Sequence, residues 1–368
     1  MIIKSIELKN FRNYEDLTIS FDQGTNILYG NNAQGKTNIL EAAYMSGTTK
    51  SHKGSKDKEM IRFHEQEAHI RTIVGKKQPG TDCLKEYQID MHLKQNRSKG
   101  IAINQIPIKK ASELFGILNM VFFSPEDLNI IKSGPAERRR FLDAELCQLD
   151  KIYLSDLANY NKILNQRNKL LKDLVYRPDL ADTLPIWDLQ LAETGKKIIC
   201  RRKQFIEELN EIVYHIHFKI SGGKEELLLK YEPNTDAILF EEELKKANDK
   251  DKRLCMTSVG PHRDDMLFSI GGIDIRKFGS QGQQRTSALS LKLSEIELVK
   301  RTIHDTPVLL LDDVLSELDS NRQNYLLNSI SDIQTLITCT GLDEFVRNRF
   351  QINKIFQVVE GHVTERHG

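Results

Sequence analysis

One eight-residue stretch constrains this chain more than any other: Gly30-Asn31-Asn32-Ala33-Gln34-Gly35-Lys36-Thr37. It has the form G-x-x-x-x-G-K-T, in which glycines let the backbone curl until several N–H groups point at one phosphate. In this P-loop pattern the lysine neutralises the β- and γ-phosphates, and the threonine hydroxyl can ligate Mg²⁺. The motif therefore predicts that residues 30–37 bind a nucleoside triphosphate.

The flanks of the motif support this prediction. A phosphate-binding loop needs a strand before it and a helix after it, because the positive end of the helix completes the anion site. Residues 25–29 read as a buried strand, and residues 37–45 combine good helix formers with an apolar face at Leu40, Ala43 and Tyr44. A glycine-rich turn that merely precedes a helix is the alternative, and these flanks argue against it.

Composition narrows the class of protein. The 368 residues could form two domains, or one large domain with an appendage. A net charge of +1 gives no overall attraction to nucleic acid, so any such binding needs local patches. Five scattered cysteines form no C-x-x-C pair, which is typical of a reducing cytoplasm. Without a signal peptide or a long apolar window, we expect a cytoplasmic protein with no membrane partner.

The N-terminal part alternates like an antiparallel sheet. Ile2, Ile6 and Leu8 would share one strand face, and a turn at residues 10–14 leads to a second strand. Short alternating runs between residues 68 and 108 predict a meander, and residues 121–123 predict a buried strand. The lysine-rich stretch 48–58 is either a solvated loop or a surface for DNA phosphates. The candidate phosphate contacts there are Lys50, Lys53, Lys56 and Lys58.

The middle of the chain changes to helical periodicity. Apolar residues recur at 4-3 spacing over residues 153–174 and 198–216, interrupted only by Arg167 and Arg202. Breaks at Arg177-Pro178 and Pro185 separate the two helices, which we expect to pack as an antiparallel hairpin extending roughly 35–45 Å. A projecting arm is favoured over two helices buried in a globular core.

Three consecutive arginines, Arg138, Arg139 and Arg140, follow a helix start at Ser133-Gly134-Pro135. They cannot share one helix face, so at least one is expected to point inward or toward a partner. Arg138 is taken as a further candidate DNA contact.

The last third returns to α/β patterning. A polar cluster at residues 257–265 precedes a predicted strand at 266–270, and a small-residue loop at 278–285 opens a helix that runs to about Ile303. His262 beside two carboxylates could suggest a metal site, but a single nitrogen ligand argues against one. Residues 335–340 supply one more buried strand.

An apolar strand at residues 307–313 ends in two acids, in the form of a Walker-B strand. Acids at the carboxyl end of a parallel strand lie where open α/β sheets bind ligands. Asp312 would hold Mg²⁺ through water, and Asp313 would orient the attacking water. The pattern is weak by itself but strong in a chain that also has a P-loop.

Most of the chain separates these two motifs, and the helical hairpin lies between them. A split head of this kind, with Ser280-Gln281-Gly282-Gln283-Gln284 shortly before the acidic strand, resembles the ABC-type ATPase heads of the SMC and RecF group. The implied fold is α/β: a mixed β-sheet around a P-loop core, with an inserted helical-hairpin arm. Residues 1–145 and 257–368 would form the head, and residues 146–256 the arm.

Within that group the whole chain resembles the RecF family of bacterial recombination-repair proteins. The matching stretches are ordered along the sequence and therefore specific: residues 8–14, 30–37, 51–57, 124–128, 138–143, 260–265, 279–285 and 310–319. The short arm agrees, since SMC proteins have hundreds of residues there.

The resemblance implies a set of ligands and partners. ATP and Mg²⁺ would bind at residues 30–37 with Arg12, and Ser280, Gly282 and Gln283 would contact the nucleotide of the opposite subunit in an ATP-dependent head-to-head homodimer. Catalysis would fall to Lys36 and Asp313, giving a weak DNA-dependent ATPase. The implied partners are double-stranded DNA near single-strand gaps, RecR and RecO, with RecA loaded downstream.

Three departures from the wider ABC pattern affect the expected rate of ATP hydrolysis. No glutamine stands near Ser124, Thr340 stands where many heads have a histidine, and Asp313 replaces the usual glutamate. A base set back by one methylene positions water less well, and such misplacement is costly in rate. We therefore expect slow hydrolysis, with ATP acting mainly as a dimerisation switch.

Other classes fit less well. An SMC-like DNA-bridging structural ATPase would need a longer arm. A transporter ATPase subunit would need a membrane partner. A nuclease would need a second cluster of acids and histidines.

Overall fold

The computed structural model describes residues 1–78, 83–341 and 352–366. The chain forms two compact units, one of Met1–Asp127 with Glu295–Gly368 and one of Leu128–Ser294. The predicted arm, residues 146–256, lies inside the second unit, which begins earlier and ends later because segments on both sides of the hairpin pack with it.

The first unit contains a mostly parallel sheet in the order β15-β14-β3-β13-β12-β8. Strands β3, β8, β12, β13 and β14 run parallel, and β15 is an antiparallel edge strand. The predicted buried strands are confirmed as Thr25–Tyr29 (β3), Met120–Phe123 (β8), Val308–Asp312 (β12) and Thr335–Cys339 (β13). The two further strands, Ile352–Val359 (β14) and His362–Arg366 (β15), were not predicted.

The same unit contains the predicted antiparallel meander, in the order β2-β1-β4-β5-β6-β7. A bulge between Ile3 and Ser5 shifts the alternation of β1, so Ile3 rather than Ile2 joins Ile6 and Leu8 in the core. The strands are Ile2–Phe11 (β1), Tyr14–Ser20 (β2), Glu67–Lys77 (β4), Leu84–Lys94 (β5), Gly100–Ile103 (β6) and Ile106–Pro107 (β7).

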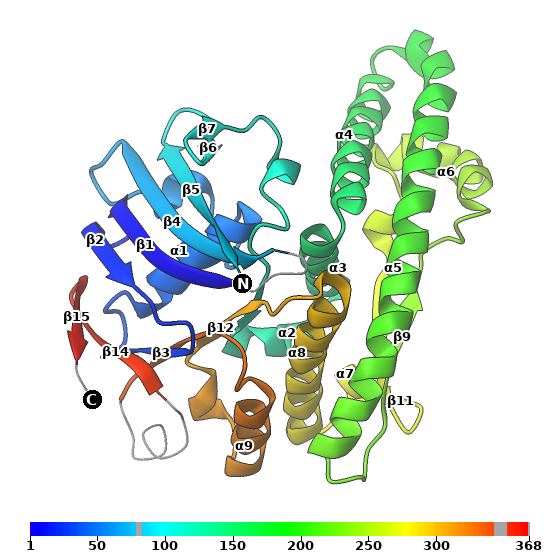
Figure 1. Cartoon of the computed structure of the whole chain (residues 1–368). Coiled ribbons are helices and arrows are strands. Elements are labelled where there is room, and N and C mark those ends of the chain that lie inside the picture. Colours follow the sequence, from blue (N-terminus) through cyan, green and yellow to red (C-terminus); the bar gives the residue numbers. More distant parts are fainter. Residues whose placement is uncertain (79–82, 342–351, 367–368) are drawn as a thin grey trace. The chain divides into compact units, whose positions relative to one another are not determined.

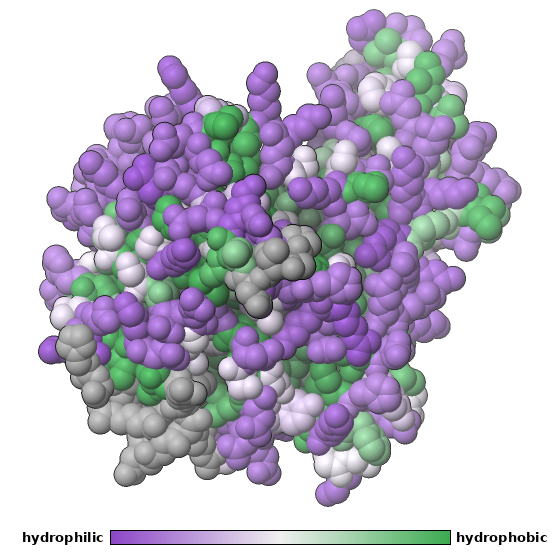
Figure 2. Space-filling view, viewed as in Figure 1, coloured by the Kyte–Doolittle hydropathy of each residue, from purple (hydrophilic) through white to green (hydrophobic). Residues whose placement is uncertain are grey.

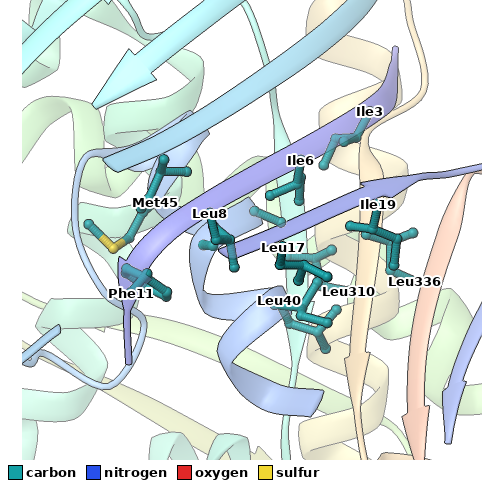
Figure 3. Close-up of a cluster of buried hydrophobic side chains, with 14 of the residues drawn as sticks. Ile3, Ile6, Leu8, Phe11, Leu17, Ile19, Leu40, Met45, Leu310 and Leu336 are labelled. Atoms are coloured by element: carbon teal, nitrogen blue, oxygen red, sulfur yellow. The ribbon is translucent and has the colours of Figure 1, made fainter. Parts of the chain in front are cut away.

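Helix α1 (Lys36–Thr48) packs between these sheets. Figure 3 shows Leu40 of α1 near Leu17 of β2 and Leu310 of β12, all without solvent contact or nearly so. Because α1 starts within the P-loop, this apolar core fixes the direction in which the loop faces. Helix α9 (Ser320–Ser329) follows the acidic end of β12.

The second unit contains the helical hairpin. Helices α4 (Lys151–Asp173) and α5 (Leu184–Ile220) run side by side as the predicted antiparallel pair (Figure 1). At 1.5 Å per residue, the 37 residues of α5 extend roughly 55 Å, longer than expected. Pro185 does not break the chain, because it lies in the first turn of α5, where a missing N–H costs nothing.

The rest of the unit packs along the hairpin. A three-stranded sheet has the order β11-β10-β9. The remaining bounds are Leu128–Lys132 (α2), Pro135–Leu149 (α3), Leu227–Glu232 (β9), Phe240–Leu254 (α6), Asp265–Ile270 (β10), Ile273–Asp274 (β11) and Ile275–Phe278 (α7). Helix α8 (Gln281–Ile303) begins in this unit and continues beyond its last residue, Ser294.

On the face drawn in Figure 2, hydrophilic side chains predominate and hydrophobic ones are scattered. Among the described residues, no helix has both the length and the hydropathy needed to span a bilayer.

Candidate nucleotide-binding site

Two glycines give the P-loop its shape. Gly30 and Gly35 adopt φ values of +155° and +111°, which side-chain-bearing residues rarely reach. A Cβ on Gly30 would lie 2.2 Å from the carbonyl oxygen of Val358, and a Cβ on Gly35 would lie 2.5 Å from Nδ2 of Asn13. The loop thus has no room for larger residues at its two fixed glycines.

Turns from distant parts of the chain brace the loop. Asn13 Nδ2 donates to the carbonyl oxygen of Gln34 at 3.0 Å, and Tyr14 Oη donates to that of Gly35 at 3.1 Å. The backbone N–H of Gly361 also donates to Gln34, at 3.2 Å. Burial raises the pKa of Tyr14, which keeps this hydroxyl a neutral donor. Sequence reasoning placed Asn13 and Tyr14 in a turn and in a stretch that resembles the RecF family, but gave them no role at the P-loop.

Lys36 is buried at the centre of the loop. Its Nζ donates to the carbonyl oxygens of Gly30 at 2.6 Å and Asn31 at 3.0 Å. The ammonium group is therefore held inside the ring of backbone that a phosphate would face, and phosphate oxygens would replace these carbonyls as acceptors.

The acidic end of β12 meets the start of α1. Thr37 Oγ1 donates to Asp312 Oδ1 at 2.8 Å, so the two predicted Mg²⁺ ligands lie together. Thr338 Oγ1 also donates to Asp312 Oδ1, at 2.7 Å, and accepts from the Asp313 N–H at 3.0 Å. Thr338 was missed by sequence reasoning. Its place opposite Asp312 follows from the parallel register of β12 and β13, which a single sequence does not reveal.

Asp313 stands just past the end of β12 with φ +52°, a left-handed conformation that is uncommon outside glycine. Burial raises the pKa of its carboxyl, Lys36 lowers it, and the neighbouring Asp312 carboxylate raises it, with a net increase. Asp313 is thus a weaker acid than an ordinary aspartate.

The donor set fits a hard cation. A hydroxyl and a carboxylate, both oxygen donors, are what Mg²⁺ takes from protein when phosphates and water supply the rest. Across the described ranges, no group of three or more His, Cys, Asp or Glu side chains is arranged to hold a metal by itself.

Arg12, predicted to contact the nucleotide, is strongly held within the first unit. Its guanidinium makes a bidentate ion pair with Glu41 of α1, with both N···O distances 2.8 Å, and Nη2 donates to Ser55 at 3.0 Å. Burial opposes ionisation of Glu41, but hydrogen bonds from Arg12 and Ser51 outweigh it and lower the pKa of that carboxyl. The pair ties the turn after β1 to α1.

The candidate DNA contacts divide into two groups. Lys50, Lys53, Lys56 and Lys58 all have exposed side chains in the first unit. Arg138 does not, and its prediction as a DNA contact is wrong. Only 2% of it is exposed, and its Nε and Nη2 bind Asp265 at 2.6 and 3.1 Å. Among the three arginines it is the inward-pointing one.

The loop before α8 lies in the second unit. Ser280 Oγ accepts from the Gln283 N–H at 3.2 Å, and Gln283 Oε1 accepts from the Ser280 N–H at 2.9 Å. This reciprocal pair is a capping box, so Ser280 and Gln283 begin the helix. Gly282 is exposed, and a Cβ there would have only Ser280 Oγ, at 3.8 Å, within 4 Å. Contacts inside the described chain therefore do not require a glycine at this position.

The polar cluster at residues 257–265 is structural. His262 Nδ1 pairs with Tyr160 Oη at 2.7 Å and Nε2 with the Thr257 carbonyl oxygen at 3.1 Å, so both ring nitrogens are used. Arg202 binds Asp264 at 3.0 Å and Asp143 at 2.8 Å. Buried ion pairs thus account for the two arginines that interrupt the apolar periodicity of the predicted helices. Arg202 is one of them, and the other, Arg167, binds Asp188 and Asp251 in the interior.

Comparisons with known proteins agree with this geometry. The family model described as RecF/RecN/SMC N terminal domain matches residues 2–364. The chain is 74% identical to the DNA replication and repair protein RecF of Agathobacter rectalis and 62% identical to that of Lachnospira eligens, covering 99% of each chain in both cases.

Solved structures extend the likeness to the fold. A structure of the recombination mediator protein RecF-ATP in the RecFOR pathway has a TM-score of 0.91 and 37% identity, covering 99% of this chain and 97% of the other. An Smc head domain from Pyrococcus furiosus, with a TM-score of 0.56 and 18% identity, covers 99% of this chain and shares the fold alone. The predicted ABC-type head with a helical insertion is confirmed. The chain belongs to the RecF family of DNA replication and repair proteins.

Proposed function

We propose that this protein is an ATP-dependent, DNA-binding recombination mediator that uses ATP chiefly as a dimerisation switch. The observation that carries the proposal is the convergence of Lys36 and Thr37 with Asp312 and Asp313 across one sheet edge. The solved RecF-ATP relative supports ATP as the nucleotide.

Different residues of the site would bind the phosphates and the Mg²⁺ ion. Backbone N–H groups of residues 30–37 and the start of α1 would face the phosphates, and Lys36 would exchange its two carbonyl partners for phosphate oxygens. Thr37 and Asp312 would hold Mg²⁺, which neutralises phosphate charge. Thr338 fixes the orientation of Asp312 and anchors the backbone of Asp313.

Slow hydrolysis follows from Asp313. Its arm is one methylene shorter than that of glutamate, and a base set back by that distance positions the attacking water less well. The shorter arm favours a long-lived ATP state.

The dimer proposal rests on the loop before α8. Ser280 and Gly282 are exposed, and Phe278, two residues before Ser280, is 75% exposed. An exposed apolar ring beside an unobstructed glycine suits a surface that a second copy covers. We infer that Ser280 and Gly282 contact the ATP bound by the other subunit.

The DNA part of the proposal concerns duplex DNA near single-strand gaps, with RecR and RecO as protein partners and RecA loaded as the outcome. The RecFOR description of the solved relative supports the protein partners. The exposed lysines 50, 53, 56 and 58 supply a local positive surface that the net charge of +1 does not.

Fluorescence anisotropy with labelled ATP and labelled duplex DNA tests both parts. Lys36→Ala should abolish ATP binding. Alanine at all four lysines should weaken binding to every DNA sequence and reduce the slope of log K against log salt by about 0.9 for each lost phosphate contact. The matched control replaces four exposed lysines elsewhere in the first unit, Lys85, Lys94, Lys109 and Lys110. Equal losses in the two quadruple variants would remove the 50–58 surface from the proposal.

A further inference from the structure

The last turn of α5 and the loop after it reach the start of α8. His217, in that last turn, is fully buried, and its Nδ1 lies 3.0 Å from Ser290 Oγ of α8. Glu225, in the loop, lies between His217 and Gln283: Oε2 is 3.5 Å from His217 Nε2, and Oε1 accepts from Gln283 Nε2 at 2.9 Å. The end of the arm helix and the loop after it thereby contact α8 at two residues, Ser290 and, in the first turn, Gln283.

The bond from Glu225 fixes which way the Gln283 amide points. A carboxylate can only accept, so it holds the NH₂ group of Gln283 and leaves the amide oxygen facing the other way. That oxygen is the one that accepts from the Ser280 N–H. A flipped amide would place an NH₂ group against that N–H and break the capping box.

The loop that carries Glu225 is itself ordered. Gly222 and Gly223 adopt φ values of +69° and +77°, which lets the chain reverse directly after α5. Ser221 Oγ accepts from the Glu225 N–H at 3.2 Å and donates to its carbonyl oxygen at 3.3 Å. Glu225 is therefore presented to α8 from a defined turn.

We infer that Glu225 is a positioning residue for the dimer: through Gln283 it orients Ser280 for the ATP of the opposite subunit, and it connects that orientation to the arm helix α5. This inference rests on the proposed ATP-dependent dimer. Neither Glu225 nor His217 lies in any motif that predicted the site.

The test compares three glutamate variants by light scattering across a protein concentration series with ATP. Glu225→Ala should weaken ATP-dependent dimerisation about tenfold, the usual effect of losing a hydrogen bond to a charged group. Glu225→Gln keeps an acceptor for Gln283 and should restore dimerisation to near the wild-type level. Glu226→Ala is the matched control, because Glu226 is exposed and accepts from Tyr214 Oη at 2.9 Å. Equal dimerisation by Glu225→Ala and wild type would overturn the inference.

Mixing Glu225→Ala with Lys36→Ala distinguishes a positioning defect in the loop before α8 from a general folding defect. Glu225→Ala has an intact P-loop, and Lys36→Ala has an intact loop before α8, so a mixed dimer contains one complete site. Lys36→Ala, which should not dimerise alone, should therefore enter ATP-dependent dimers when Glu225→Ala is added. Failure to form such mixed dimers would show that Glu225→Ala is defective in more than the loop it presents, and would overturn the inference.

Ser280→Arg is measured alongside. If it leaves wild-type dimerisation intact, the proposed dimer itself fails. If it abolishes dimerisation while Glu225→Ala does not, only the role of Glu225 fails.

Discussion

Thr338 joins the two acids of the nucleotide site into one hydrogen-bonded unit. Its hydroxyl donates to Asp312 and accepts from the backbone of Asp313. Thr338→Val keeps the shape but leaves the Asp313 N–H unpaired and frees the Asp312 carboxylate to turn. We expect ATP hydrolysis to fall by about tenfold or more, because a small misplacement of the catalytic carboxylates is costly in rate.

Steady-state hydrolysis with labelled ATP measures this effect. Thr364→Val is the control, because Thr364 is exposed on β15, the edge strand of the same sheet. A Thr338→Val enzyme with wild-type turnover would show that the hydroxyl only fills space.

His262 makes the stability of the second unit depend on pH. Burial lowers its pKa to about 4, below the 6.5 of an exposed imidazole. Between these two pKa values the imidazole is protonated in the unfolded chain but not in the folded chain. The unfolding free energy therefore falls as the pH drops from about 7 toward 4. Between pH 7 and pH 5 this one group should cost roughly 2 kcal/mol of unfolding free energy.

Urea unfolding followed by the fluorescence of Trp187, the chain's single tryptophan, reports on the hairpin directly. His262→Gln removes the titration and should flatten the difference between pH 7 and pH 5 relative to wild type. The same difference in both proteins would place the acid sensitivity elsewhere.

At the scale of elements, the arm is held by buried charge. Arg202 of α5 binds Asp143 of α3 and Asp264 before β10, and Asp264 also accepts from Tyr231 of β9. Removing the arginine leaves a fully buried carboxylate without its cation. We expect Arg202→Met to lower the unfolding free energy by about 3–5 kcal/mol.

The neighbouring arginine is the matched control. Arg201 binds Asp150 at 3.0 Å, but its side chain is 22% exposed, so Arg201→Met should cost no more than about 1 kcal/mol. Guanidinium unfolding read at Trp187 compares the two. Similar midpoints for both variants would contradict the account of the buried network.

Elements with strong local signals were predictable, whereas contacts set by tertiary register were not. The P-loop, the acidic strand and the hairpin carry fixed motifs or long periodic runs, and they form where expected. Thr338 and Glu225 carry no such signal. The partner of Thr338 depends on the pairing of β12 with β13, and that of Glu225 on the path of the loop after α5. Arg138 was misassigned for the same reason, since Asp265 lies far along the chain.

At the scale of the whole molecule, the proposed ATP switch requires a second copy of the chain. The P-loop belongs to one compact unit and the Ser280 loop to the other. In the proposed dimer, ATP held by one subunit is covered by Ser280 of its partner. ATP binding should therefore raise the molecular mass of the protein in solution.

The most direct test is light scattering of Asp313→Asn, which should trap the ATP state, with and without ATP and Mg²⁺. We predict a rise from the 42.3 kDa of one chain to twice that mass. Adding Ser280→Arg should prevent the rise, whereas Ser155→Arg, at an exposed serine of α4, should not. A monomer with and without ATP would contradict the dimerisation switch and the role given to Ser280.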